Sequence, residues 1–127
     1  MSADDTGEYK IIRPTSKSSF GEVRLYEETL LDHIPENHPE LKLVGTLLGS
    51  NLLASAIEEA IVNPTKLHQS VTSATTEVFV SSRVLSVGNQ LVVPVRGIAG
   101  TTSGRVATAY FSDNDYPGTL IWSADDA

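Results

Sequence analysis

The chain has 127 residues, 40% of them hydrophobic and 20% charged, which suits one buried core and argues against disorder. It contains no cysteine, which excludes disulfides, thiolate metal sites and thiol nucleophiles. The formal charge of −7 disfavours binding to nucleic acid or anionic membranes unless basic residues gather in one place. The segment 78–112 does gather three arginines and has no acidic residue, so we expect a locally positive region there.

The first residues predict an arm rather than part of a core. Residues 1–20 are polar, and we expect them to be partly disordered or to form one short strand at 9–13. Residues 21–127 then form a single domain. No stretch approaches the roughly 18 apolar residues that a membrane helix needs, and the acidic N-terminus does not resemble a secretory signal. We therefore expect a soluble cytoplasmic protein without membrane contact.

The first half of that domain predicts one strand followed by helices. Residues 22–26 alternate between apolar and polar side chains, which is typical of a strand. Residues 27–34 predict a short helix that Pro35 ends. A new helix is expected to begin at Pro39, and residues 52–62 have an apolar stripe at helical spacing.

The second half is rich in strand-forming residues. Strands are expected at 76–85, 90–96, 105–111 and 119–122, with 105–111 as the clearest central strand. Pro94 indicates an edge, a bulge or a strand end. The order of elements predicts an α+β fold with N-terminal helices packed on a roughly four-stranded antiparallel sheet.

Two of the three histidines, His33 and His38, lie close together in the sequence. Their spacing of five residues, with Pro35 between them, does not place two ligands on one helical turn, so we expect no zinc pair. Considered singly, His33 is expected to pack near a helix end, and His38 is expected to cap the start of the next helix. Arg83, at a predicted strand end, reads as a solvated side chain, and Thr108 as an ordinary strand former. We expect neither a metal nor a cofactor.

Four short motifs in a fixed order nevertheless resemble a known family. They are His33-Ile34, His38-Pro39-Glu40, the helix end at Asn63-Pro64, and the strand with Thr108-Ala109-Tyr110. Over residues 22–122 the chain resembles the phage-associated domains of the barnase–EndoU–colicin–RelE superfamily of small metal-independent ribonucleases. The resemblance implies catalytic roles for His33, His38, Arg83 and Thr108. Contacts to RNA are expected from Arg96, Arg105 and Tyr110.

The implied reaction is the cleavage of tRNA or mRNA by the RNA's own 2′-hydroxyl. One histidine takes the proton of that hydroxyl and the other protonates the leaving 5′-oxygen. Arg83 binds the phosphate, and Thr108 donates a hydrogen bond to it. A toxin or phage-related nuclease of this kind is expected to have a cognate inhibitor or immunity protein.

Two other classes of function stay open at this stage. One is a non-catalytic protein-interaction module on the same scaffold, with an exposed apolar surface or strand edge. The other is a small-ligand binder with an apolar pocket under the helix at 52–62. The ribonuclease hypothesis predicts that His33, His38, Arg83 and Thr108 converge in one cleft.

Overall fold

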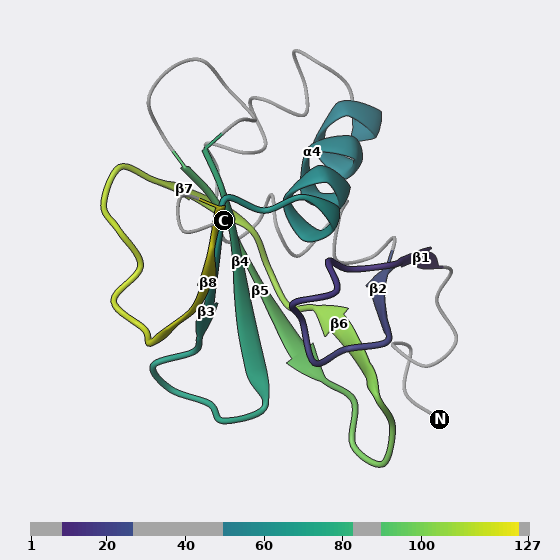
Figure 1. Cartoon of the computed structure of the whole chain (residues 1–127). Helices are drawn as coiled ribbons and strands as arrows, with labels where there is room; N and C mark the ends of the chain where they lie inside the picture. Colours follow the sequence, from purple (N-terminus) through teal and green to yellow (C-terminus); the bar gives the residue numbers. More distant parts are fainter. Residues whose placement is uncertain (1–8, 27–49, 83–89, 125–127) are drawn as a thin grey trace.

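The computed structural model describes residues 9–26, 50–82 and 90–124 (Figure 1). Two strands, β1 (Tyr9–Ile12) and β2 (Glu22–Tyr26), precede the helix α4 (Ser50–Val62). Six further strands follow the helix: β3 (Lys66–Gln69), β4 (Thr76–Ser81), β5 (Gln90–Gly97), β6 (Ser103–Val106), β7 (Tyr110–Ser112) and β8 (Leu120–Ser123).

All eight strands belong to one mixed sheet. Its order is β1-β2-β6-β5-β4-β3-β8, and β7 pairs with β5. Each pair is antiparallel except β2 and β6, which run parallel with Val23 opposite Gly104. This parallel pair joins the first hairpin to the rest of the sheet.

The predicted architecture of N-terminal helices on a four-stranded antiparallel sheet is therefore wrong. The helix in the described part of the chain follows two strands that are themselves part of an eight-stranded mixed sheet. The expected helices at 27–34 and from Pro39 lie outside the described residues. The prediction failed for two reasons. The alternation in 22–26 identifies a strand but not the strand with which it pairs, and β3 has too few apolar residues to be recognised in the sequence.

The helix α4 covers one face of the sheet (Figure 1). Ile57, Ala60 and Ile61 are fully buried against the sheet, in one core cluster with Phe79 and Val93. These helix residues recur at the three- and four-residue spacing of a single helical face. Burial of this face, rather than helix propensity, is the main source of the helix's stability.

A β-bulge interrupts the strand that the sequence predicts at 105–111. Val95 pairs with Val106, but Val92 pairs with Tyr110, so residues 107–109 face only two residues of β5. The bulge lies beside Pro94, which has no N–H to donate. On the other side of β5, the N–H of Gly97 donates to Thr75 O of the segment before β4 at 2.9 Å. Since hydrogen-bonded positions alternate along a strand, the odd-numbered residues of β5 direct their backbone N–H groups toward β4. The backbone nitrogen of Pro94 therefore faces the bulge, where the regular ladder of hydrogen bonds is already interrupted. The missing N–H of the proline thus removes little hydrogen bonding from the sheet.

Candidate functional site

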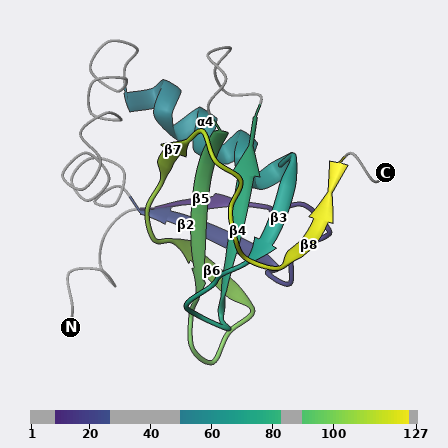
Figure 2. The ribbon, with the colours of Figure 1, turned by 90° about the vertical axis from the view of Figure 1, so that its left-hand side faces the viewer.

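The sheet face turned away from α4, which we call the open face, holds a second apolar cluster. Val78, Val80 and Val92 form it, and the rings of Tyr110 and Tyr116 pack against them. The segment that joins β7 to β8 runs along this side of the sheet and carries Tyr116 (Figure 2). The open face is thus partly covered by a connection rather than by a described helix.

A cleft of about 450 Å³ opens beside the bulge, and we call it the Thr108 cleft. Thr108 and Pro94 line it together with Tyr110 and Tyr116, and so does Arg96, the next-to-last residue of β5. The connection between β3 and β4 adds hydroxyl groups, from Ser70, Thr72 and Ser73. The lining therefore combines two aromatic rings, several hydroxyls and one guanidinium.

Thr108 has an unusual hydrogen-bonding state. Its Oγ1 is buried and has no hydrogen-bond partner. Buried hydroxyls are normally paired, and an unpaired one costs about 1–3 kcal/mol. Thr108 lies in the bulge, between the register of β5 with β6 and the register of β5 with β7. The additional residue of a bulge is left out of the regular pairing of the strands.

The other unpaired buried side-chain atom within the described ranges is Nε2 of His68. Its Nδ1 lies 2.9 Å from the carbonyl oxygen of Gly118, so Nδ1 carries the proton and donates it. The imidazole is 5.4 Å from the ring of Tyr116, centroid to centroid. The Tyr116 hydroxyl in turn accepts the N–H of Val71 at 3.1 Å. These contacts hold the wall of the Thr108 cleft in place.

The pKa values of Tyr110, which lines the cleft, and of Asp115, which precedes Tyr116 in the chain, shift in opposite directions. Burial raises the pKa of Tyr110, and the neighbouring Tyr116 adds to the rise, so its phenol stays protonated at neutral pH. The hydrogen bond from Gln90 lowers the pKa of the Asp115 carboxyl, and the nearby charge of Lys66 lowers it further. Asp115 itself does not line the cleft, and Arg96 is the basic side chain among the residues that do.

Arg96 is the end of a line of three arginines across neighbouring strands, which we call the arginine row. In the strand registers Arg24 of β2 is opposite Arg105 of β6, and Arg105 is opposite Arg96 of β5. Directly opposed residues share a face and lie about 5 Å apart at the backbone. The three guanidinium-bearing side chains therefore start from adjacent points on the open face.

Tyrosine rings position the first two members of this row. The guanidinium carbon of Arg24 is 4.9 Å from the centroid of Tyr9, and that of Arg105 is 4.6 Å from the centroid of Tyr26. The two rings are 4.9 Å apart. A ring contact occupies the flat side of a guanidinium, whereas its N–H groups point outward in the plane.

Two members of the row differ in their ion pairs. Arg24 forms an ion pair with Glu22 at 3.4 Å, and its hydrogen bond to the hydroxyl of Tyr26 raises its pKa. Arg96 is exposed and makes no ion pair with another described residue. Like charges directly opposite in a sheet are destabilising, so stability alone does not account for this arrangement.

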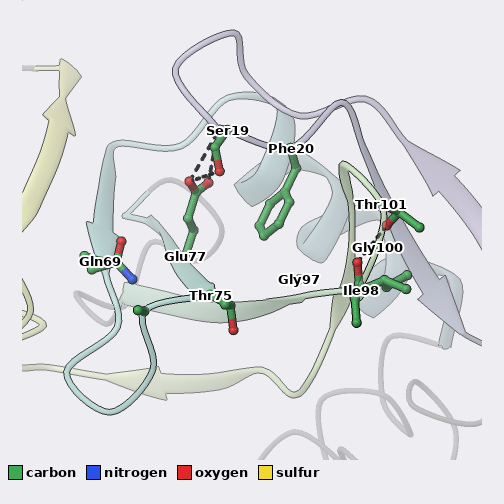
Figure 3. A pocket seen from close by; sticks show the side chains of 11 residues that line it. Ser19, Phe20, Gln69, Thr75, Glu77, Gly97, Ile98, Gly100 and Thr101 are labelled. Atoms are coloured by element: carbon green, nitrogen blue, oxygen red, sulfur yellow. Dashed lines mark hydrogen bonds between the residues drawn. The ribbon is translucent and has the colours of Figure 1, made fainter.

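A second hollow, of about 570 Å³, lies on the other face of the sheet near the ends of the hairpins (Figure 3). Glu77 is 7% exposed there, and its carboxylate accepts hydrogen bonds from the Ser18 hydroxyl at 2.6 Å and the Ser19 hydroxyl at 2.5 Å. The Ser19 N–H also donates to it. These bonds saturate the carboxylate, so Glu77 anchors the loop before β2 to the sheet.

The predicted site residues are placed as follows. Thr108, Arg96 and Tyr110 line one cleft, and Arg105 is next to Arg96 in the arginine row. His33, His38 and Arg83 lie outside the described residues, so their convergence with Thr108 stays a prediction. Neither hollow is lined by α4, where a pocket for a small ligand was expected.

Sequence reasoning missed Arg24 and the tyrosines Tyr9 and Tyr26. The alternation in residues 22–26 does place Arg24 and Tyr26 on one face of a strand, and that signal could have identified them together. Their neighbours could not be inferred, because nothing local indicates that β2 pairs in parallel with β6.

Comparison with protein-family models, with curated proteins and with solved structures finds no match. Among the residues that the structure describes, no three His, Asp or Glu side chains are grouped as metal ligands would be. No helix in the same residues is both long and apolar enough to span a membrane.

Proposed function

We propose that the open face binds a single strand of RNA through the arginine row. The observation that carries this proposal is the alignment of Arg24, Arg105 and Arg96 in register across three adjacent strands. Arginine's planar N–H groups match the geometry of phosphate oxygens, and a line of them matches a chain of phosphates.

The tyrosines favour an unpaired strand over a duplex. Proteins bind single-stranded RNA by combining a positive track for the backbone with aromatic rings on which bases stack. Tyr9 is 42% exposed at one end of the arginine row, and Tyr110 and Tyr116 line the cleft at the other end. The overall charge of −7 weakens binding elsewhere on the surface and makes the row the preferred site.

Cleavage of the bound RNA is the second part of the proposal. The phosphate contacts come from the arginine row, while the proton transfers are assigned to His33 and His38 by the resemblance to metal-independent ribonucleases. In this mechanism the 2′-hydroxyl attacks the adjacent phosphorus, one histidine accepts its proton, and the other protonates the 5′-oxygen that leaves. The physiological setting we propose is a cytoplasmic toxin or phage-related nuclease with an inhibitor protein.

One observation supports the alternative of a protein-interaction module. The terminal strand β8 exposes Leu120 (46%) and Ile121 (44%), and only its β3 side is paired in the described sheet. An unpaired apolar edge of this kind can accept a strand from a partner. The interaction module predicts that the protein neither binds nor cuts RNA.

Binding is tested by fluorescence anisotropy of a 5′-labelled 12-nucleotide RNA at several salt concentrations. Three phosphate contacts to a single strand predict a slope of log K against log salt of about −2. Arg96→Gln or Arg105→Gln should weaken binding about tenfold and reduce that slope by about 0.7. The matched control is Lys17→Gln, which removes one positive charge from the loop before β2 and should change neither quantity.

Cleavage is tested by incubating the full chain with total tRNA and mRNA in EDTA, beside a His33→Ala, His38→Ala double variant. Specific cuts made by the wild type alone support the nuclease. If both proteins bind RNA and neither cuts it, the binding proposal stands without catalysis. If Arg96→Gln, Arg105→Gln and Lys17→Gln all bind RNA as the wild type does, the arginine row is not the binding site.

A further inference from the structure

We infer that the Thr108 cleft takes one unstacked nucleobase of the RNA strand that lies on the arginine row. This inference rests on the proposed RNA binding and adds a site that reads a base rather than the backbone. Its first support is the form of the cleft, which at about 450 Å³ is within the range of pockets that hold small planar ligands.

The walls of the cleft have the chemistry that a base requires. Tyr110 and Tyr116 bring aromatic rings to it, while Val78 and Pro94 provide apolar surface. Bases in single-stranded RNA are recognised by stacking on such rings and by hydrogen bonds to their edges.

The unpaired hydroxyl of Thr108 is the second support. Its Oγ1 is buried in the protein without a partner, and Thr108 lines this cleft. A hydroxyl can both donate and accept, and the edge of every nucleobase presents donors or acceptors. A base in the cleft would satisfy the hydroxyl, whereas an apolar ligand would leave it unpaired.

Arg96 connects the two sites. It is the last member of the arginine row and also lines the Thr108 cleft, so a phosphate bound to it lies beside the cleft. The base attached to that nucleotide can turn out of the stack and enter. The backbone is held by the row and the base by the cleft, so the two contributions are separable.

The test compares two ligands of equal charge: a 12-nucleotide RNA and an abasic ribose-phosphate chain of the same length. Each is measured by anisotropy with the wild type, with Thr108→Val, which has nearly the same shape without the hydroxyl, and with Thr108→Ser, which keeps it. The wild type and Thr108→Ser should bind the RNA about tenfold more tightly than the abasic chain. Thr108→Val should lose most of that preference, which is the ratio of the two affinities within one variant and therefore does not depend on how tightly that variant holds the backbone.

The outcomes separate the two proposals. Equal binding of RNA and abasic chain by the wild type, or an unchanged preference in Thr108→Val, overturns the base site and leaves backbone binding intact. Binding of neither ligand overturns the RNA-binding proposal itself. Thermal unfolding of Thr108→Val is the folding control, and its Tm should be no lower than that of the wild type, because the substitution removes an unpaired buried hydroxyl.

Discussion

Gly104→Ala should destabilise the protein through a steric clash at the centre of the sheet. A Cβ at Gly104 would lie 2.6 Å from Cγ1 of Val95 and 3.1 Å from the ring of Phe20. Val95 is fully buried, so its methyl group has little room to move away. Gly104 is in β6, between β5 and β2, where the β1–β2 hairpin joins the rest of the sheet, and the next residue is Arg105.

Crowding one methyl group into a packed core costs about 1–3 kcal/mol, and we expect about 2 kcal/mol of lost unfolding free energy here. At this chain length that corresponds to a fall in Tm of about 6–12 °C. Urea denaturation followed by circular dichroism measures the free energy directly. The matched control is Gly21→Ala, whose added Cβ would meet nothing closer than 3.5 Å, and it should change stability by less than about 0.5 kcal/mol.

A double-mutant cycle identifies the atoms responsible. Val95→Ala removes the methyl that clashes and should cost about 2 kcal/mol alone. Combined with Gly104→Ala, the new methyl fills part of the space left at position 95, so the double variant should be about 1–2 kcal/mol more stable than the sum of the two predicts. Simple additivity, or a Gly104→Ala variant as stable as Gly21→Ala, would refute the steric argument.

Two further predictions concern carboxylates. Glu77→Gln should lower the free energy of unfolding by about 1–3 kcal/mol, because the serine hydroxyls and the Ser19 N–H donate to both carboxylate oxygens and the amide keeps only one acceptor oxygen. Urea denaturation measures this loss beside Glu58→Gln, which removes only a surface ion pair with Lys10, and equal effects of the two substitutions would contradict the anchoring role. The pKa of Asp115 is lowered in the folded state, chiefly by Gln90, so its contribution to stability is present above the ordinary aspartate pKa and is lost as the pH falls through the lowered value. NMR titration should show this pKa rising toward its ordinary value in Gln90→Ala, and no rise would exclude that hydrogen bond as the cause.

The sequence identifies those elements whose pattern is local. The apolar stripe of α4 and the alternation in β2 are each visible within a dozen residues, and both elements are found where they are expected. Pro94 indicates an edge, a bulge or a strand end, and the structure has a bulge in the segment beside it. These features depend on the preferences of adjacent residues, which a sequence displays directly.

Features that depend on distant partners could not be predicted. The strand β3 has one strongly apolar residue, Leu67, and becomes a strand because β4 and β8 flank it. The arginine row needs the registers of two strand pairs, one of them parallel, before Arg24 can be placed beside Arg105. Only the resemblance predicts a site role for Thr108, and that role stays a prediction. The unpaired hydroxyl of Thr108 lies in a bulge that no local sequence pattern specifies.

The parallel pairing of β2 with β6 has a consequence for the order of folding. The pairs among β3, β4, β5, β6 and β7 join strands that are close along the chain, and β3 with β8 closes a longer loop, but the contact between Val23 and Gly104 closes the longest loop in the described sheet. Contacts that close long loops are entropically costly and form slowly. We expect the β1–β2 hairpin to dock last, in a late kinetic phase, so that the three guanidinium groups come together only in that step. A stopped-flow experiment that monitors ligand capture during refolding should therefore show a lag behind the formation of the remaining sheet.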